Sequence, residues 1–365
     1  MASTPTCNLR IPGPTPLPPR VRQAMAEQMI SHRGADFEAL YREVVQGLAP
    51  IYGTRGDVLL LTASGTGGLE ASVVNTLSPG QKALVVTIGV FGDRVAEIAA
   101  AYGVPVTRLS FPLGQAAEPE AVREALRRDP ELDVVLVTHN ETSTGVTNDI
   151  AAIAAAVRSA RDPAPLLVVD AVSSLGAIEM RMDEWGCDMV VTASQKACMT
   201  PPGLAMIGVG PRAWPWIERA KLPRFYFDLL AARKYAGRAN TPYTPAVSAL
   251  YGLRAGLELM REEGLEAIYA RHRRLAAKTR AGLQALGLRL LADPAHASDT
   301  VTAAYVPEGC DGEALVERLA REHGLFVGEG QGKLKGKILR VAHMGCVDDR
   351  DIEEALVALE RALAR

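Results

Sequence analysis

Residues 58–110 read VLLLTASGTGGLEASVVNTLSPGQKALVVTIGVFGDRVAEIAAAYGVPVTRLS. Three short apolar runs stand out in this stretch, Val58–Thr62, Ala83–Thr87 and Val106–Leu109, and helix-length amphipathic segments near 67–77 and 92–102 separate them. The runs do not alternate polar with apolar residues, which is typical of strands covered on both faces. A strand–helix–strand repeat of this kind predicts an α/β fold with a mostly parallel sheet and helices on both sides.

The same pattern continues on both sides of this stretch. Further strands are predicted at Val134–Thr138, Leu166–Asp170, Met189–Thr192 and Leu204–Val209, with helices near 20–30, 36–49, 118–128 and 149–160. The last two runs lie close together in the chain, which favours an antiparallel pair.

After residue 245 the pattern changes. A long helix over 245–283 is broken at Gly264, and strands at Thr300–Val306 and Ile338–Ala342, an extended piece at 325–327 and helices at 312–322 and 349–363 follow. Asp348 and Asp349 suit the N-terminus of the last helix, because carboxylates stabilise the positive end of a helix dipole.

These changes divide the chain into an arm and two domains. Five prolines between residues 12 and 19 exclude a helix interior or a central strand, so residues 1–20 are predicted to form an extended arm lying on a surface. Residues 21–257 are predicted to form a large domain and residues 258–365 a smaller C-terminal α+β domain.

The composition is that of an ordinary globular protein. The 365 residues carry 40 Lys and Arg against 42 Asp and Glu, and 48% of them are hydrophobic, which excludes a disordered chain or a disulfide scaffold. A net charge of −2 gives no reason to expect a nucleic acid or an anionic membrane as partner. No apolar run reaches the roughly 20 residues of a membrane span, and the N-terminus lacks the apolar core of a secretory signal.

The cysteines indicate a compartment. Five of them (Cys7, Cys187, Cys198, Cys310 and Cys346) are scattered without metal-binding spacing, so we expect no metal site and reduced thiols in a cytoplasmic protein.

Candidate functional residues follow the predicted strands, where ligands collect in open α/β sheets. Ser64, Gly65 and Thr66 come just before a helix, and such a loop offers backbone N–H groups and hydroxyls to a phosphate; the alternative is a simple capped turn. Phe91 lies between glycines and could stack on a ring or act as a hydrophobic staple.

Three further strand ends carry polar residues. The cluster His139–Gly145 could line a site or form a hydrogen-bonded turn, and Asp170 could meet a ligand cation or form a structural ion pair. Lys196 is one of only eight lysines and has apolar neighbours, which would favour its neutral, nucleophilic amine; a lysine that snorkels to the surface is the alternative. Together, a phosphate loop, a stacking aromatic, a carboxylate and a desolvated lysine are what pyridoxal 5′-phosphate (PLP) needs.

Several segments in the right order resemble the class V aminotransferases of PLP fold type I, most closely the alanine–glyoxylate and serine–glyoxylate (serine–pyruvate) enzymes. The resemblance runs nearly end to end. Its segments are ASGTGGLE (63–70), GVFGDR (89–94), HNETSTGV (139–146), VVDAVSSLG (168–176), SQKACMTPPG (194–203), NTPYTPAVSALYGLR (240–254) and GKILRVAHMG (336–345).

The resemblance implies a role for each matching residue. Lys196 would form the Schiff base and shuttle the proton, and Asp170 would pair with the pyridinium nitrogen. Arg340 would bind the substrate carboxylate, with the arm around Gly13 beside the pocket. The remaining residues implied to touch the cofactor are Ser64, Gly65, Thr66 and Gln195 at the phosphate, Thr142 near the phenolic oxygen, Phe91 and Val172 on the two ring faces, and Thr244 with Tyr243 from the partner subunit of a homodimer.

The reaction implied is the ping-pong transfer of an amino group from a small amino acid, alanine or serine, to a 2-oxo acid such as glyoxylate or pyruvate. Two alternatives within the fold are an aspartate-type transaminase and a lyase or desulfurase, which needs a mobile cysteine such as Cys310 or Cys346. A third is a non-catalytic subunit, since some relatives carry hydrogenase-associated names; the presence of Lys196, Asp170 and Arg340 together argues against it.

Overall fold

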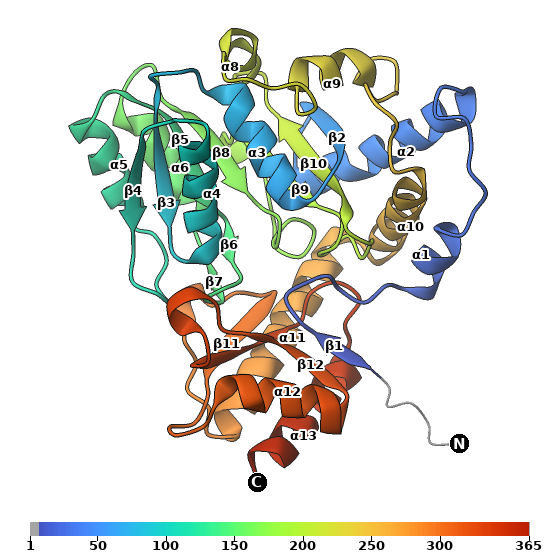
Figure 1. Ribbon diagram of the computed structural model, residues 1–365, viewed down its shortest axis with the longest axis vertical. Coiled ribbons are helices and arrows are strands. Elements are labelled where there is room, and N and C mark those ends of the chain that lie inside the picture. Colours follow the sequence, from blue (N-terminus) through green and yellow to red (C-terminus); the bar gives the residue numbers. More distant parts are fainter. Residues whose placement is uncertain (1–6, 365) are drawn as a thin grey trace.

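The computed structural model describes residues 7–364 and contains a seven-stranded and a four-stranded β-sheet joined by long helices, together with a small two-stranded hairpin (Figure 1). The larger sheet has seven strands in the order β2-β10-β9-β8-β5-β3-β4. Their bounds are Asp57–Ala63 (β2), Lys82–Thr87 (β3), Val106–Ser110 (β4), Leu132–Thr138 (β5), Leu166–Asp170 (β8), Met189–Ala193 (β9) and Gly203–Val209 (β10). Only β10 runs antiparallel to its neighbours, so the predicted, mostly parallel α/β sheet and its antiparallel pair are confirmed.

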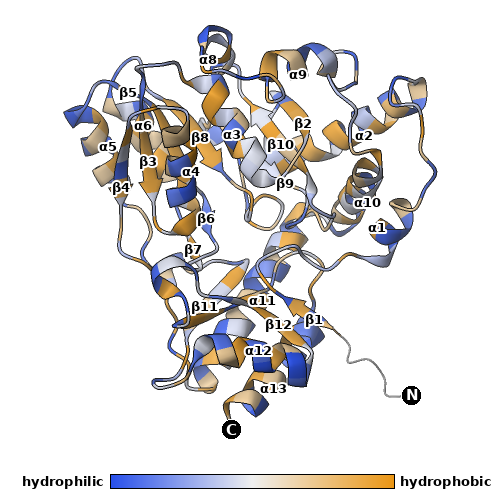
Figure 2. Ribbon diagram, in the orientation of Figure 1, coloured by the Kyte–Doolittle hydropathy of each residue, from blue (hydrophilic) through white to orange (hydrophobic). Residues whose placement is uncertain are grey.

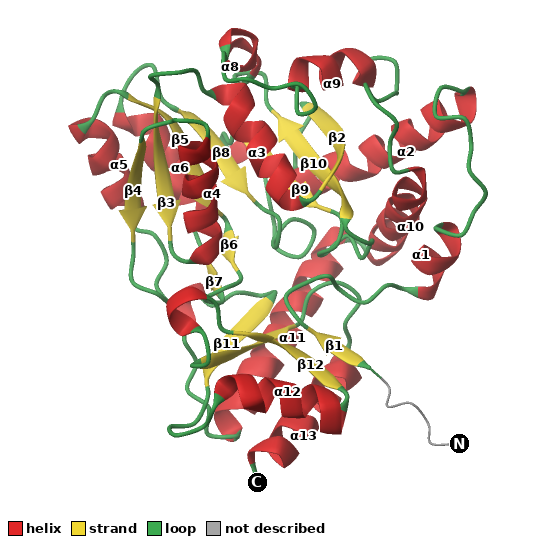
Figure 3. Ribbon diagram, in the orientation of Figure 1, coloured by secondary structure: helices red, strands yellow, loops and turns green. Residues whose placement is uncertain are grey.

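Helices cover both faces of this sheet, because its strands other than the edge strand β4 are largely apolar and buried on both faces (Figures 2 and 3). In β5, for example, Val135 and Val137 belong to one hydrophobic core, and Val134 and Leu136 belong to the other. The first core includes residues of α1 (Pro19–Ala24), α2 (Ala35–Tyr52), α5 (Pro119–Arg128), α6 (Ile150–Ala160), α7 (Met182–Trp185) and α10 (Val247–Glu263). The second includes residues of α3 (Gly65–Thr76), α4 (Val90–Ala101), α8 (Trp214–Arg219) and α9 (Leu229–Ala236).

A second unit is built on a four-stranded sheet with the order β1-β12-β13-β11. Its strands are Asn8–Arg10 (β1), Val301–Tyr305 (β11), Leu325–Glu329 (β12) and Ile338–Ala342 (β13), and α11 (Leu265–Ala285), α12 (Gly312–His323) and α13 (Asp349–Leu363) pack a core against it. Gly264 separates α10 from α11 with a φ of +85°, which confirms the predicted helix break. Short 3₁₀ turns lie at Pro294–His296 and Gly332–Leu334.

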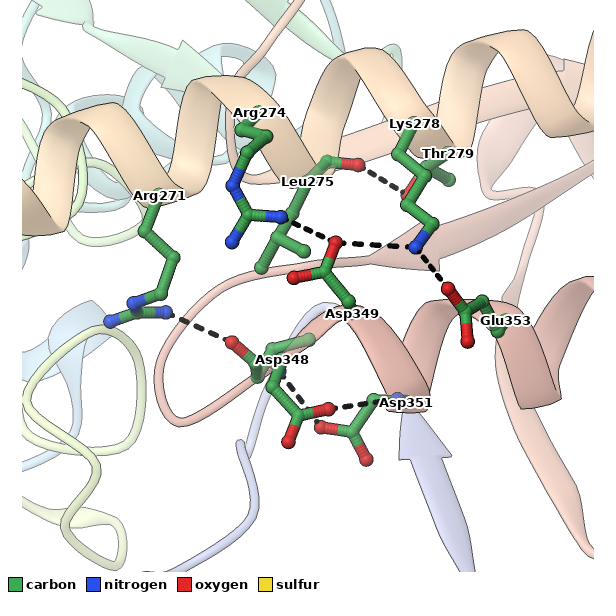
Figure 4. A network of polar contacts seen from close by, with 10 residues as sticks. Arg271, Arg274, Leu275, Lys278, Thr279, Asp348, Asp349, Asp351 and Glu353 are labelled. Carbon is green, nitrogen blue, oxygen red and sulfur yellow. Dashed lines mark hydrogen bonds and ion pairs between the residues drawn. The ribbon is translucent and has the colours of Figure 1, made fainter.

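The closing helix begins where the sequence predicts. Asp348 and Asp351 form a reciprocal capping box, in which each side chain accepts a hydrogen bond from the other residue's backbone N–H, at 3.0 and 3.1 Å (Figure 4). Asp349 also pairs with Arg274 and Lys278 of α11 (Figure 4). These contacts attach α13 to α11 at the surface of the second unit.

The N-terminal arm differs from its prediction. Residues 1–6 of the predicted arm lie outside the described residues, and residues 8–10 form β1, which pairs in parallel with β12 of the same chain. The buried Arg10 lies 3.7 Å from Asp351 of α13, so the arm is part of the C-terminal unit from its first strand. The predicted domain boundary at residues 257/258 falls within α10.

Two other sequence expectations were wrong. The predicted helix over 20–30 ends at Ala24, because the residues that follow, from Ala26 to Met29, are exposed and have no apolar face to bury. The sequence reading also missed α8 and α9, and the small hairpin of β6 (Asn140–Glu141) and β7 (Val146–Thr147) that follows β5. Among the described residues, no helix is both long and apolar enough to cross a membrane.

Candidate active site

A cavity of about 180 Å³ lies where the strands of the large sheet end. Nine residues singled out from the sequence line it, and they come from the ends of five strands, β2, β3, β5, β8 and β9. They are Ser64, Gly65, Thr66, Phe91, Thr142, Asp170, Val172, Gln195 and Lys196.

Lys196 lies in the turn between β9 and β10. Its Nζ donates a hydrogen bond to the carbonyl of Pro12, and Thr15 fixes the turn through a hydrogen bond from its hydroxyl to the Lys196 carbonyl at 2.9 Å. Burial is the main cause that lowers the pKa of this amine to about 8, and the nearby Arg340 lowers it further, while Asp170 opposes the shift. The structure therefore raises the fraction of the neutral, nucleophilic Lys196 amine well above that of an ordinary lysine at the same pH.

Asp170 is the last residue of β8 and its side chain is buried. Burial raises the pKa of its carboxyl to about 6, and repulsion by Glu141 adds to this rise. One oxygen, Oδ1, accepts a hydrogen bond from the backbone N–H of Val172 at 3.0 Å, which opposes the shift. The other oxygen accepts no hydrogen bond from the described residues, so it is available to a proton donor in the cavity.

The N-terminus of α3 forms another wall. Ser64 is its N-cap and accepts a hydrogen bond from Gly67 N–H at 3.4 Å. A Cβ on Gly65 would lie 2.9 Å from Val172, so only glycine lets the helix start this close to the strand end after β8. Gln195 adds a buried carbonyl oxygen without a hydrogen-bond partner among the described residues. Backbone N–H groups at a helix N-terminus suit a phosphate, and the Gln195 side chain can add to them only through its amide NH2 group, because its oxygen is an acceptor.

Phe91 and Val172 supply the apolar walls of the cavity. Phe91 is the second residue of α4, and the guanidinium of Arg94 lies 4.7 Å from the centre of its ring. An aromatic face and a β-branched side chain suit a flat ring between them.

Arg340 lies on β13 of the second unit and is buried. Its Nε donates to the carbonyl of Glu329 at 2.7 Å and its Nη1 to the carbonyl of Thr142 at 3.1 Å. Burial lowers the pKa of the guanidinium to about 10, and Glu141 and Glu329 oppose this shift. Nη2 donates to no described residue, which leaves a donor for a carboxylate.

The arm closes the lysine side of the site. Gly13 has a φ of +97°, and a Cβ placed there would lie 2.6 Å from Nζ of Lys196. Gly13 therefore lies against the Lys196 amine, and only glycine fits this position, while its place beside the substrate pocket stays a prediction.

Tyr243 and Thr244 are not among the described residues that line this cavity. Tyr243 stacks on Tyr226 with ring centres 5.2 Å apart, and its hydroxyl donates to the carbonyl of Phe225 at 3.1 Å. Thr244 is exposed. The two residues lie at an aromatic surface, in which the ring of Phe225 is 78% exposed.

Sequence reasoning missed four residues that line the cavity, namely Leu69, Arg94, Asn140 and Ser173. Asn140 donates to Ser173 at 2.8 Å and to Thr300 of the second unit at 2.9 Å. Arg94 and Asn140 both lie within segments that the sequence reading quoted, and Arg94 follows Phe91 by three residues, which places it on the same side of α4. That spacing was the available signal for Arg94.

The family model described as Aminotransferase class-V matches residues 8–342. The chain belongs to the class V aminotransferase family. Its relatives include the L-aspartate–glyoxylate aminotransferase of Paracoccus denitrificans, which is 40% identical over 97% of this chain and 90% of that protein. A protein named soluble hydrogenase, small subunit, from a Synechococcus strain is 44% identical over 98% of this chain and 92% of that protein.

Solved structures agree with the family. The alanine–glyoxylate aminotransferase of a Nostoc species superposes with a TM-score of 0.94 at 31% identity, covering 99% of this chain and 96% of that one. The class V aminotransferase is therefore a PLP-dependent enzyme of fold type I. The residues of the cavity fit the cofactor, because one Asp170 oxygen accepts no hydrogen bond from the described residues, the Gln195 amide side chain makes none, and the pKa of the Lys196 amine is lowered.

Proposed function

We propose that this aminotransferase moves the amino group of a small amino acid, alanine or serine, to a 2-oxo acid such as glyoxylate or pyruvate. One observation carries the proposal: the desolvated Lys196 and the buried Asp170 line one cavity, and the buried Arg340 lies close enough to lower the pKa of the Lys196 amine. Bound PLP supplies an aldehyde that joins to amines and a ring that accepts the electron pair released at the neighbouring carbon. The two glyoxylate aminotransferases described above are named for different amino donors, aspartate and alanine.

Each residue has a proposed task. The Lys196 amine holds the cofactor and, once released, carries the proton between the two carbon atoms that exchange it. The free oxygen of Asp170 holds the proton of the ring nitrogen. Arg340 binds the substrate carboxylate with the N–H groups that its two carbonyl partners leave free. Ser64, Gly65, Thr66 and Gln195 bind the phosphate, Phe91 and Val172 enclose the ring, and Thr142 lies beside it.

The alternatives have less support. A desulfurase needs a reactive thiol at the cavity, and neither Cys310 nor Cys346 lines it. Partial desolvation also raises the pKa of the Cys346 thiol, although the residue is exposed, and this disfavours the thiolate. The hydrogenase name of one relative gives no task to Lys196, Asp170 and Arg340.

The test is a panel of half-reactions. The purified enzyme loaded with PLP is mixed with alanine, serine, aspartate or cysteine, and the 2-oxo acid released in a single turnover is measured by chromatography. We expect pyruvate from alanine or hydroxypyruvate from serine to form fastest. Faster release of oxaloacetate from aspartate, or sulfide from cysteine, would instead establish one of the alternatives.

We also propose that the enzyme is a homodimer with shared active sites. The aromatic surface of Phe225, Tyr226 and Tyr243 supports this, because a large exposed apolar group favours a protein partner. Thr244 lies next to this surface and would reach the phosphate of the other subunit.

The cellular location is a further proposal. All five cysteines of the chain are described, and all are free, Cys7 and Cys346 among them although they are exposed. Exposed free thiols are typical of a reducing compartment, so we place the enzyme in the cytoplasm.

A further inference from the structure

Glu141 is a buried carboxylate that the proposed reaction does not use. It lies in β6, the first strand of the small hairpin after β5, and its side chain has no solvent exposure. Its oxygens accept four hydrogen bonds. Oε1 accepts from the backbone N–H and the hydroxyl of Ser143 at 3.0 and 2.6 Å, and Oε2 accepts from the backbone N–H groups of Phe91 and Gly92 at 3.0 and 3.2 Å.

These contacts require the ionised carboxylate. Three of the four donors are backbone N–H groups, which cannot accept a proton in return. The fourth, the Ser143 hydroxyl, accepts from the backbone N–H of Val90 at 3.0 Å and so directs its own hydrogen to Glu141. Burial raises the pKa of this carboxyl, and the four hydrogen bonds oppose the rise.

The carboxylate fixes the start of α4. The N-cap of α4 is Gly89, which has no side chain to cap the helix. The first three N–H groups of the helix, on Val90, Phe91 and Gly92, therefore bind Ser143 and Glu141 of the neighbouring loop. A Cβ on Gly89 would lie 2.7 Å from the carboxyl carbon of Glu141, so this position leaves room only for glycine. The backbone of Phe91 is thus held directly by Glu141.

The same loop holds the substrate arginine. The residue after Glu141 is Thr142, whose carbonyl accepts from Nη1 of Arg340 at 3.1 Å. The charge of Glu141 also acts on the Arg340 guanidinium and stabilises its protonated form. Three consecutive residues, 141 to 143, therefore connect α4 on the large sheet with β13 on the small one.

We propose that Glu141 is a positioning residue, which sets the Phe91 ring wall and the Arg340 guanidinium at a fixed separation. The proposal rests on the functions proposed above for Phe91 and Arg340. Because Phe91 and Arg340 belong to units built on different sheets, a common anchor keeps the cofactor ring and the substrate carboxylate at fixed positions relative to each other.

The test variant is Glu141→Gln, which keeps the shape of the side chain. It replaces one acceptor oxygen with an NH2 donor, which cannot accept from the N–H groups that it faces. We expect the far-UV circular dichroism to stay unchanged. The dissociation constant of PLP, measured by equilibrium dialysis with the apo-protein, should rise by about tenfold or more, and KM should rise for the amino acid and the oxo acid alike. Ser143→Ala, a milder change that keeps the Phe91 and Gly92 contacts, should shift both quantities in the same direction by a few fold.

Asp188→Asn is the matched control. Asp188 is also a buried carboxylate, which accepts from the backbone N–H of Leu167 at 2.8 Å and pairs with Arg212, but it does not line the cavity. This variant should lose thermal stability and keep the PLP dissociation constant and both KM values.

The outcomes separate the two proposals. Suppose that the wild-type protein binds PLP and turns over. If Glu141→Gln and Ser143→Ala then have the wild-type PLP dissociation constant and KM values, the positioning role is wrong. The same holds if the two variants change only in Tm, as Asp188→Asn should. If Glu141→Gln does not fold, Ser143→Ala alone decides the question. A wild-type protein that binds no PLP would overturn the proposed function itself.

Discussion

Burial prepares the amine of Lys196 for its reaction, because the cavity solvates an ammonium ion poorly. With a pKa of about 8, half of this amine is neutral at pH 8. An ordinary lysine reaches the same neutral fraction only near pH 10.5. We expect the rate at which apo-protein takes up PLP covalently to rise with pH and level off above about 8. Stopped-flow absorbance at a series of pH values measures it, and a profile that keeps rising to pH 10 would contradict the shift.

Replacement of the same lysine tests its covalent role. Lys196→Ala should keep the fold and lose turnover by about a thousandfold or more, because both the attachment point and the proton carrier are gone. Borohydride reduction and peptide mass mapping should find the cofactor on Lys196 in wild type and on no residue in the variant. Lys278→Ala, which changes a surface lysine of α11, serves as the control.

Asp170 gives a prediction for the protein without cofactor. Its folded pKa of about 6 lies above the ordinary value of 3.8, so the native state binds the proton more tightly than the unfolded chain. The free energy of unfolding should therefore fall as the pH rises from about 4 to 6, by up to about 3 kcal/mol. Asp170→Asn should remove this fall, as seen in urea titrations across that range, and should also abolish transamination. Parallel pH profiles for the two proteins would show that the carboxyl is not shifted.

Arg340 is expected to act on both substrates. The two half-reactions use substrates that share the carboxylate and differ elsewhere, so Arg340→Ala should raise KM for the amino acid and the oxo acid together. The loss in kcat/KM should correspond to about 2–4 kcal/mol, the size expected for a bidentate, charge-assisted contact. Steady-state kinetics with both substrates varied measures the two KM values. A wild-type KM for either substrate in this variant would contradict the proposed role of Arg340 in carboxylate binding.

Among the elements, the segment between β1 and α1 is in direct contact with the Lys196 amine. Gly13→Ala would place a Cβ 2.6 Å from Nζ of Lys196 at a φ of +97°, so it should displace the amine and weaken PLP binding by about tenfold. Gly103→Ala is the matched control, because Gly103 also has a positive φ, of +72°, but no atom lies near its added Cβ. The control should lose about 1 kcal/mol of stability and keep the affinity, as measured by dialysis and urea unfolding.

The strands of the large sheet were predictable because each carries its own signal. The predicted run Val134–Thr138 is apolar on both faces, and the helices between the strands have the matching length, so the fold class follows from local pattern. β1 has no such signal. Its three residues become a strand only because β12, more than three hundred residues later, offers an edge. The short helices α8 and α9 likewise depend on the core against which they pack.

The candidate site also contains some residues that the sequence predicted and others that it did not. Lys196 and Asp170 were predictable because residues that follow parallel strands meet at one edge of a sheet. Glu141 and Arg94 were quoted but given no role, because what a side chain contacts across two loops depends on the tertiary structure. The hydrogen bonds from Phe91 and Gly92 to Glu141 join positions about fifty residues apart, and no spacing in the chain indicates them.

For the whole molecule, shared active sites predict complementation. Thr244→Asp puts a negative charge where the partner's phosphate would lie, and Thr244 is exposed, so folding should tolerate it. This variant and Lys196→Ala should each be inactive alone. When equal amounts are mixed and the subunits allowed to exchange, about a quarter of wild-type activity should return, because half of the dimers are mixed and each has one intact site.

The mixing experiment has a clear negative result. If each chain builds its own phosphate site, Thr244→Asp keeps its activity, or the mixture stays as inactive as its components. Analytical ultracentrifugation of the two variants checks that both remain dimers.

The pairing of β1 with β12 also has a consequence for how the polypeptide is made. On the ribosome, residues 8–10 emerge more than three hundred residues before the edge that they occupy, so this segment must wait without its partner while the large sheet assembles. The two ends meet again when α13 arrives, since Asn8 donates to the carbonyl of Asp351 at 2.8 Å. A circular permutant that joins these ends through a short linker and opens the chain in a surface loop would deliver β1 together with its sheet, and should therefore gain its final structure sooner after synthesis.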